Sequence, residues 1–354
     1  MTSPIIFLDA NTVWHLRLAE ALAKSGPVVA ISPASGAYPK TCTSVSQGLK
    51  QVMINLPRGW ASSSAFIGQR ILHRHVRKEA HSMGGKPLIV LTSPVYAPLA
   101  ERISGEFPII SYTSDDYRSY SGWGGNSVVT KERRINLLAE LSVFVSETLR
   151  ERAIREFGLG RARTLLSPNA TERRFADHVP ANILAGLAGR SRPVVGVLGA
   201  LTNRLNIEVL AAVAASPKVG TFLVAGPASD DLLKQYEIFR SPKCIIAGQI
   251  DHSNMHLYAQ ALDVALIAYA RTQLNYHCSP LRLYDHLATG VPIVALTGCH
   301  QVDHSNYDAV RIVGDDQFLN KVEELIAEPT LKLHNPPSDC FWDARALVLR
   351  EALS

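Results

Sequence analysis

Cysteine is scarce in this chain of 354 residues, which holds only five thiols. Their number is odd and their positions are widely spaced, without a C-x-x-C pair, which argues against a disulfide framework and against a zinc site. Long apolar runs are also absent, since none approaches the ~20 residues that cross a bilayer. Residues 1–4 lack the basic start of a signal peptide. We therefore expect a cytoplasmic protein with reduced cysteines.

The excess of positive charge is small: 36 Lys and Arg against 31 Asp and Glu give a formal net charge of +5. This excess does not indicate a nucleic-acid-binding protein, and we expect no nucleic-acid partner. The basic residues are concentrated at 58–86, where Glu79 is the only acid. With the apolar residues Trp60, Phe66 and Ile67, this segment is typical of a helix that binds an anionic membrane surface. The alternative is a core helix with one solvated basic face.

Apolar strands alternate with helical segments along the whole chain. Continuous apolar runs of this kind indicate parallel sheets covered by helices on both faces, the α/β class. The runs lie at 5–8, 28–31, 88–91, 109–112 and 143–145, and the alternation starts again at 193–195 after a basic stretch at 189–192. The chain is long enough for two domains, which we place at residues 1–170 and 171–340.

The segment 279–296 combines a helix start, a basic residue, an acid and a helix stop. Ser279 is a suitable N-cap and Pro280 a suitable first-turn residue for a helix that continues through Leu281 and Arg282. The free N–H groups of such a helix start attract phosphate. Asp285, one turn further on the same face, offers an acceptor for the two hydroxyls of a ribose. The alternative is an ordinary helix of a parallel sheet with Arg282 and Asp285 as solvated charges.

This segment resembles the donor-site helix of GT-B glycosyltransferases, which has a pattern close to S/C-P-x-K-x-x-E-x-x-A-x-G-x-P-V-V. Other segments fall in the order that this family requires, at 166–170, 194–204, 222–227, 245–248 and 263–269. The resemblance implies the GT-B architecture, in which two Rossmann-like domains with parallel sheets face each other across a cleft. The first domain would bind the acceptor and the second the donor. The C-terminal helix, 341–354, would pack back on the first domain.

The same resemblance implies which residues bind the donor. Arg204 and Arg282 would face the diphosphate and stabilise the charge that develops on it, so that we expect neither a metal ion nor another cofactor. His277 stands where related enzymes have the first of two glutamates, and Asp285 stands where they have the second. Backbone groups of residues 248–250 would hold the base. The full donor set is Gly199, Arg204, Gly248, Gln249, Ile250, His277, Ser279, Pro280, Leu281, Arg282 and Asp285.

Asp115 and Asp116 follow the apolar strand at 109–112. They resemble part of the Tyr-Asp-x-x-Asp-Asp segment of bacterial glycosyltransferases that build teichuronic acids and exopolysaccharides. An acid at the carboxyl end of a central strand is placed to take the proton of an acceptor hydroxyl as a general base. Strand alternation sends the two carboxylates to opposite sides, with Asp116 on the side of Ser114, and we favour Asp116 as the base. The alternative is that both acids cap the following turn.

We therefore expect a metal-independent hexosyl- or uronosyltransferase that moves a sugar from a nucleotide diphosphate donor to a saccharide or lipid-linked acceptor in bacterial polysaccharide biosynthesis. A UDP-sugar is the expected donor, because residues 281–285 are similar to the corresponding helix of the xanthan glucuronosyltransferase. One alternative is a UDP-sugar epimerase of the same architecture, which would need catalytic acids for proton abstraction. Another is a non-enzymatic two-domain binding protein of periplasmic type, which would need a signal peptide.

Overall fold

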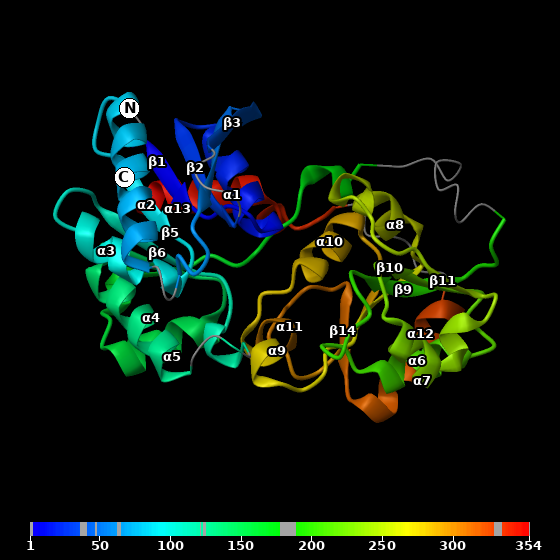
Figure 1. Cartoon of the computed structure of the whole chain (residues 1–354). Helices are drawn as coiled ribbons and strands as arrows, with labels where there is room; N and C mark the ends of the chain where they lie inside the picture. Colours follow the sequence, from blue (N-terminus) through cyan, green and yellow to red (C-terminus); the bar gives the residue numbers. More distant parts are fainter. Residues whose placement is uncertain are drawn as a thin grey trace. The chain divides into compact units, whose positions relative to one another are not determined.

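The chain forms two compact units, each built on its own sheet (Figure 1). Unit 1 comprises Met1–Asn169 and Trp342–Ser354, and unit 2 comprises Ala170–Phe341. The computed structural model describes residues 3–35, 41–46, 48–61, 65–120, 122, 125–177, 189–328 and 335–353. Residues 62–64 of the basic segment and residue 354 of the C-terminal helix lie outside these ranges. The division after Asn169 lies one residue before the boundary that we placed from the sequence.

Unit 1 contains an 8-stranded sheet in the order β3-β4-β2-β1-β5-β6-β7-β8. Its neighbouring strands are parallel, except that β3 runs antiparallel to β4. The strands are β1 (Ile5–Leu8), β2 (Val28–Ser35), β3 (Thr41–Ser46), β4 (Leu49–Leu56), β5 (Leu88–Leu91), β6 (Ile109–Thr113), β7 (Leu141–Phe144) and β8 (Thr164–Leu166). The central strands β1, β5 and β6 are buried at every residue, as expected for a sheet covered on both faces.

The helices of unit 1 are α1 (Val13–Ala23), α2 (Ala65–Ser82), α3 (Ala97–Ile103), α4 (Asn126–Leu138), α5 (Glu147–Phe157) and α13 (Trp342–Ala352). The C-terminal helix α13 packs against α1. The Lys24 ammonium pairs with the Asp343 carboxylate at 2.7 Å, and the Arg350 guanidinium donates to the Ser3 carbonyl at 2.6 Å. Trp342 and Leu349 of α13 are buried. The last helix of the chain thus completes the first unit.

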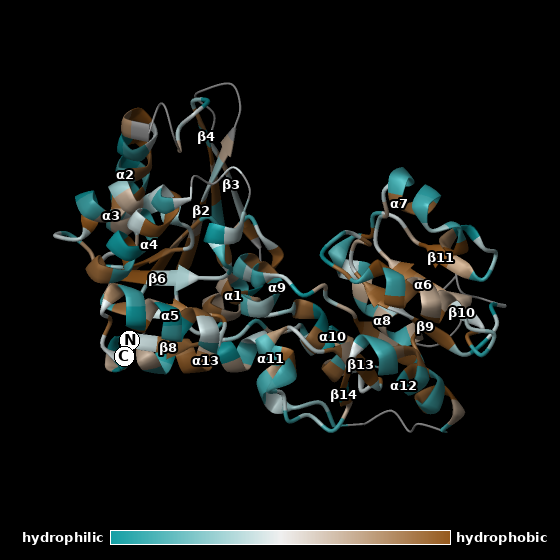
Figure 2. Ribbon diagram, turned by 90° about the horizontal axis from the view of Figure 1, so that it is seen from below, coloured by the Kyte–Doolittle hydropathy of each residue, from teal (hydrophilic) through white to brown (hydrophobic). Residues whose placement is uncertain are grey.

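Unit 2 contains a 6-stranded parallel sheet in the order β11-β10-β9-β12-β13-β14. Its strands are β9 (Val194–Leu198), β10 (Thr221–Ala225), β11 (Cys244–Ile246), β12 (Val264–Ile267), β13 (Ile293–Leu296) and β14 (Val310–Val313). Its helices are α6 (Ile207–Ala215), α7 (Asp230–Gln235), α8 (Met255–Ala261), α9 (Gln273–His277), α10 (Leu281–Thr289), α11 (His300–Asp303) and α12 (Asp315–Ala327). Hydrophobic residues gather on the strands and the sheet-facing sides of the helices (Figure 2).

Each sheet has one point where the strand order reverses. In unit 1 the chain moves outward from β1 to β2 and then returns to β5 on the other side of β1. In unit 2 it moves from β9 to β10 and β11 and returns to β12 on the other side of β9. Ligands of open α/β sheets bind outside the carboxyl ends of the strands at such points. The fold therefore predicts ligand sites at the carboxyl ends of β1 and β5 in unit 1, and of β9 and β12 in unit 2.

Candidate functional site

Helix α10 begins one residue later than the sequence pattern predicts. Ser279 is not its N-cap, because Pro280 keeps an extended backbone with ψ 119° and itself occupies the N-cap position. No side chain caps the first turn, which opens with Leu281 and Arg282. The helix ends at Gly290, whose φ of 70° is the left-handed conformation that glycine adopts without strain. The first turn of α10 therefore retains the free N–H groups that suit an anion.

Arg282 lies at the reversal point of the unit 2 sheet. Its Cζ atom lies 5.0 Å from the centroid of the Tyr269 ring, just beyond the end of β12. Gly199, which follows β9 with φ 87°, also lies close to this guanidinium, because a Cβ atom there would stand 3.1 Å from Nη2 of Arg282. The Nη1 atom of Arg282 is buried and makes no hydrogen bond. Arg282 is therefore held in place while one of its donors still lacks an acceptor.

Arg204 lies near the same tyrosine, because the next residue, Leu205, forms an isolated bridge with Tyr269. Its Nε donates to Oδ1 of Asn275 at 3.1 Å, and Nδ2 of Asn275 donates to the Arg204 carbonyl at 2.8 Å. Burial raises the pKa of the Tyr269 hydroxyl, and the charges of Arg282 and Arg204 act in the opposite direction. Neither guanidinium forms an ion pair with any residue that the structure describes. Two cations without acidic partners thus converge where β9 and β12 end.

Asp285 follows Arg282 by one turn of α10 and is bonded to the start of unit 2. The Thr171 hydroxyl donates to Oδ1 of Asp285 at 2.5 Å. Burial raises the pKa of this carboxyl to about 7, against smaller opposing effects of Thr171, His252 and Arg282. Burial makes the ionised form of this carboxyl unfavourable. Hydrogen bonds from the hydroxyl groups of a ligand would therefore stabilise its carboxylate more than they stabilise one in water. Helix α10 therefore carries the cation Arg282, which suits an anion, and one turn later the buried carboxyl of Asp285.

No family model matches the chain. It is 24% identical over 301 residues to the Bacillus subtilis (strain 168) protein named "Putative teichuronic acid biosynthesis glycosyltransferase TuaH", over 78% of this chain and 75% of that protein. Sucrose-phosphate synthase from Thermosynechococcus elongatus superposes with a TM-score of 0.71 at 17% identity, over 99% of this chain and 98% of that one. Anabaena Alr3699/HepE, solved with UDP and glucose, gives 0.71 at 16% identity, over 99% of both chains.

The chain has the GT-B fold and is a glycosyltransferase. The comparisons confirm the fold class and the enzyme class expected from the sequence, and they give no support to the epimerase or to the binding protein. Helix α10 and the loop after β9 correspond to the segments on which the sequence resemblance rested. In this glycosyltransferase, three residues that position these side chains were not predicted from the sequence. Tyr269 lies under Arg282, Asn275 orients Arg204, and Thr171 holds Asp285.

The other residues that we expected to bind the donor are more dispersed in unit 2. His277 ends α9 and is buried, with its ring centroid 5.1 Å from that of Tyr276. Gly248, with φ 70°, Gln249 and Ile250 follow β11, the edge strand, two strands away from β9. An open groove of about 910 Å³ lies along the loops after β9 and β10. Its charged lining residues are Glu208 and Asp231, so its charge disfavours a diphosphate.

Asp115 and Asp116 are both engaged within unit 1. The Asp116 carboxylate pairs with Arg152 at 2.7 Å and accepts from the Ser119 hydroxyl at 2.5 Å. Asp115 accepts from the Asp116 N–H at 2.9 Å and from the Tyr120 hydroxyl. Strand β6 already ends at Thr113, so the alternation that we used to choose between the acids does not reach them, and both are buried. That step of the sequence interpretation is wrong.

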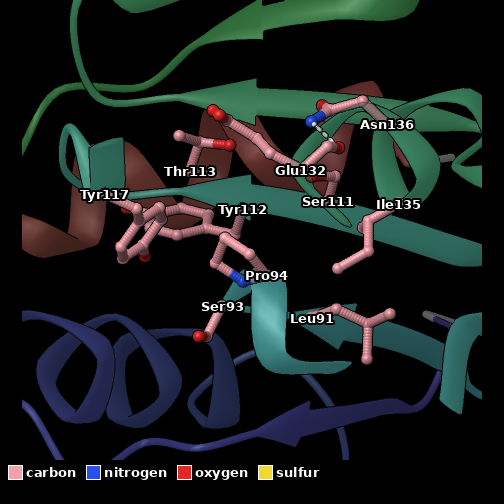
Figure 3. A pocket seen from close by; sticks show the side chains of 10 residues that line it. All are labelled: Leu91, Ser93, Pro94, Ser111, Tyr112, Thr113, Tyr117, Glu132, Ile135 and Asn136. Atoms are coloured by element: carbon pink, nitrogen blue, oxygen red, sulfur yellow. Dashed lines mark hydrogen bonds between the residues drawn. The ribbon is translucent and has the colours of Figure 1, made fainter. Parts of the chain in front are cut away.

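A small cavity of unit 1 lies where the ends of β5 and β6 meet α4 (Figure 3). Its volume of about 10 Å³ leaves room for about one water molecule and none for a sugar. The Asn136 amide donates to the Glu132 carbonyl at 2.8 Å on its wall. Its lining includes Ser93, Pro94, Ser111, Thr113, Tyr117, Glu132 and Asn136. The cavity is therefore too small to hold a sugar.

Metal ligands do not cluster in the part of the glycosyltransferase that the structure describes, where no three His, Cys, Asp or Glu side chains are arranged to hold an ion. Within the same residues, no helix is long and apolar enough to traverse a lipid bilayer.

Proposed function

We propose that this glycosyltransferase transfers a sugar from a UDP-sugar to a saccharide or lipid-linked acceptor in bacterial polysaccharide biosynthesis. The observation that carries the proposal is the convergence of Arg282 and Arg204, both without acidic partners, at the end of β9 and β12. The relatives support the choice of substrates, since Alr3699/HepE was solved with UDP and glucose. The Bacillus subtilis relative is named for teichuronic acid biosynthesis.

The two arginines explain how the nucleotide diphosphate can leave the sugar. When the bond between the sugar and the diphosphate breaks, negative charge develops on the leaving phosphate oxygen. Fixed guanidinium groups stabilise that charge more in the transition state than in the ground state, which is what accelerates the step. Nη1 of Arg282 makes no hydrogen bond within the protein, and this guanidinium is the group that we propose for the contact. We propose that no metal ion is needed, because these cations supply the positive charge.

Asp285 is proposed to bind the ribose. Its partner Thr171 occupies one oxygen, and the ionised carboxylate has further lone pairs for the two ribose hydroxyls. The backbone of Gly248, Gln249 and Ile250 is proposed to contact the base, and His277 a hydroxyl of the donor sugar. Ser279, Pro280 and Leu281 lead into the first turn of α10, which presents its N–H groups to the phosphate.

Helix α2 supports a peripheral association with an anionic membrane at the cytoplasmic face. Leu72 and Val76 face the core, whereas Phe66 and Ile67 are 63% and 55% exposed at the start of the helix. Arg70 and Arg102 lie over the Phe66 ring, with their Cζ atoms 5.1 and 5.4 Å from its centroid. Exposed aromatic and aliphatic side chains surrounded by arginines suit the interface of anionic lipids. Such a location gives access to a lipid-linked acceptor.

Turnover is tested by the release of UDP from a panel of UDP-sugars, with and without a bacterial membrane extract as the source of acceptor. The proposal predicts UDP release that requires both one UDP-sugar and the extract, and that is lost in Arg282→Ala. Retention in Arg240→Ala, an exposed arginine on the same unit, is the matched control. Absence of acceptor-dependent release with every UDP-sugar would contradict the proposed function.

Membrane association is tested separately by co-sedimentation with vesicles in which about one third of the phospholipid is anionic. Phe66→Ser/Arg70→Glu should reduce the bound fraction, and binding should fall with rising salt. Arg133→Glu, which makes the same charge change on an exposed residue of α4, is the control. Equal binding by all three proteins would exclude α2 as the membrane surface.

A further inference from the structure

Two buried cysteines of unit 2 lie with their sulfur atoms in contact. The Sγ atoms of Cys278 and Cys299 are 3.7 Å apart, although the residues are 21 positions apart in the sequence. The Cys299 thiol also donates to the Cys278 carbonyl at 3.8 Å. Both residues are reduced thiols in this structure. A disulfide has an S–S distance of about 2.0 Å, so the two sulfur atoms need to approach each other by only about 1.7 Å to form one.

The surroundings of Cys299 favour its thiolate. The Cys278 thiol lowers the pKa of the Cys299 thiol by hydrogen bonding to its sulfur, and burial acts in the opposite direction. The backbone groups of Val302 and Gln301 lower this pKa further, whereas the charge of Asp303 raises it. The thiolate is the form of cysteine that reacts with oxidants and disulfides. Cys299 therefore combines a neighbouring thiol with the electrostatics of an oxidation-sensitive residue.

The loop that carries Cys299 is held at several points. Cys299 follows β13, and the N–H of the preceding Gly298 donates to the Asp303 carboxylate at 2.9 Å. The Cys299 carbonyl accepts from the N–H groups of Val302 and Asp303 at 3.0 and 2.9 Å. Gly298 has φ 128°, a conformation that favours glycine, and a Cβ atom there would stand 3.0 Å from Cγ of Arg271. The approach of the two sulfur atoms must therefore come mainly from Cys278.

Cys278 is connected to both arginines of the candidate donor site. It ends α9, where its N–H donates to the Asn275 carbonyl at 3.3 Å, and the Asn275 side chain accepts from Nε of Arg204 at 3.1 Å. Cys278 and Pro280 both have extended backbones, and they lead directly into the first turn of α10 with Arg282. A movement of Cys278 is therefore transmitted to the segments that orient both guanidinium groups.

The tyrosine under Arg282 also lies near the two sulfur atoms. Burial raises the pKa of the Tyr269 hydroxyl, the charge of Arg282 lowers it, and Cys278 and Cys299 both raise it. The ring of the same tyrosine has Cζ of Arg282 at 5.0 Å from its centroid. A displacement of Cys278 would therefore change the packing around the ring on which Arg282 lies.

From this arrangement we propose that Cys278 and Cys299 form a redox-modification site, and that their oxidation to a disulfide weakens UDP binding. The second part of the proposal rests on the proposed function. The oxidant is a hydroperoxide, for which hydrogen peroxide is the probe. Hydrogen peroxide is only slightly larger than water, and it can approach the pair from the side of Cys278, which is 6% exposed, whereas Cys299 is 0% exposed.

The oxidation proceeds in two steps. The Cys299 thiolate attacks one oxygen of hydrogen peroxide, the O–O bond breaks, and its electrons leave with hydroxide, which takes up the proton that the thiol released. The sulfur of Cys299 is then a sulfenic acid. The Cys278 thiol attacks that sulfur, the S–S bond forms, and the sulfenic oxygen leaves as water with the thiol proton. Two thiols and one peroxide thus give one disulfide and two waters, and an added dithiol reverses the reaction by exchange.

The experiment treats wild type with hydrogen peroxide, blocks the remaining thiols with iodoacetamide and digests the protein without reductant. Mass spectrometry should find the peptides of Cys278 and Cys299 joined, with the loss of two hydrogen atoms. Isothermal titration should show that the Kd for UDP rises by about tenfold or more, the lower end of the contribution expected of Arg282. Dithiothreitol should restore the original Kd.

Three variants accompany the wild type. Cys278→Ser and Cys299→Ala each leave one thiol of the pair, so their affinity for UDP should not respond to peroxide. Cys244→Ser is the matched control, because it removes a half-buried cysteine of the same unit on the edge strand β11. This control should form the disulfide and lose UDP affinity as wild type does.

Three results would overturn the proposal. One is the absence of the joined peptides at every peroxide concentration. Another is a joined pair with an unchanged Kd for UDP. The third is an equal loss of UDP affinity in Cys299→Ala, which would assign the effect of peroxide to another residue. If reduced wild type bound no UDP, the proposed function would fail instead, whereas the peptide mapping needs no ligand and would still decide whether the pair oxidises.

Discussion

The guanidinium of Arg282 lies over the ring of Tyr269, with its Cζ atom 5.0 Å from the ring centroid. This contact joins α10 to the end of β12, and it orients a charge that has no acidic partner among the described residues. A cation–π contact of this kind contributes about 0.5–2 kcal/mol. The ring therefore positions the cation without neutralising it, as a carboxylate would.

Tyr269→Leu should weaken UDP binding, because Arg282 loses the surface that orients it. From the cation–π contribution we expect a loss of about 2- to 30-fold. Tyr269→Phe keeps the ring and should bind UDP nearly as wild type does. Isothermal titration with UDP measures both, and equal losses in the two variants would assign the role of Tyr269 to its hydroxyl instead.

Gly199→Ala should also impair UDP binding. The residue has φ 87°, and an added Cβ atom would stand 3.1 Å from Nη2 of Arg282. Gly158→Ala is the matched control, because Gly158 has φ 72° but nothing within 4 Å of an added Cβ. Both variants should lose about 1–2 kcal/mol of stability from the backbone. Only Gly199→Ala should raise the Kd for UDP. A normal Kd in this variant would show that Arg282 can move away from residue 199 without weakening UDP binding.

Much of the geometry of the candidate donor site was predictable because its signals are local in the sequence. Arg282 and Asp285 share one helix, and their spacing alone places them on one face. The start of that helix was misplaced by one residue, because Pro280 is compatible with both the N-cap and the first turn, and only the observed ψ of 119° decides. Tyr269 and Asn275 were missed because their contacts depend on how β12, α9 and α10 pack.

The surroundings of the acids in unit 1 depend on contacts between residues that are far apart in the sequence. Residues 5–9 show the same signal as 109–116, an apolar strand followed by an acid, and the sequence does not state which strand adjoins the reversal point. That decision requires the pairing of β1 with β5, whose residues are 83 positions apart. The ion pair of Asp116 with Arg152 joins residues that are 36 positions apart, and it could not be predicted from the sequence either.

Asp285 should make UDP binding depend on pH near neutrality. Only the ionised carboxylate accepts hydrogen bonds from both ribose hydroxyls, and burial raises its pKa to about 7. The affinity for UDP should therefore decline as pH falls through about 7. About one pH unit above that pKa, Asp285→Asn should bind UDP more weakly than wild type does. Its affinity should also lack this dependence on pH. Titration across the range checks it, and a parallel decline in both proteins would contradict it.

The same shift predicts the effect of Asp285 on stability. Because its pKa in the folded protein is raised above 3.8, its contribution is complete below that value and is lost as pH rises through about 7. Without UDP, the Tm of Asp285→Asn should therefore exceed that of wild type at alkaline pH and approach it in acid. A difference that is constant with pH would show that ionisation is not its cause.

Asp116→Asn should reduce stability more than it reduces chemistry. The substitution leaves Arg152 without its buried partner, which typically costs about 3–5 kcal/mol. Glu101→Gln removes one member of the exposed pair with Arg134 and should cost less than about 1 kcal/mol. Denaturant unfolding compares the two variants. An Asp116→Asn protein that is fully stable but inactive would contradict this structural role and favour Asp116 as the base.

The account depends most on Arg282 as a ligand of the donor diphosphate, and a titration of UDP and UMP into wild type and Arg282→Ala tests this directly. Both nucleotides share the base, the ribose and one phosphate, so their difference in affinity reports on the second phosphate. A charged hydrogen bond to phosphate contributes about 1.5–3 kcal/mol. Wild type should therefore prefer UDP over UMP by about 10- to 100-fold. In Arg282→Ala that preference should be largely lost, while UMP affinity changes little. An equal preference for UDP in both proteins would contradict the account.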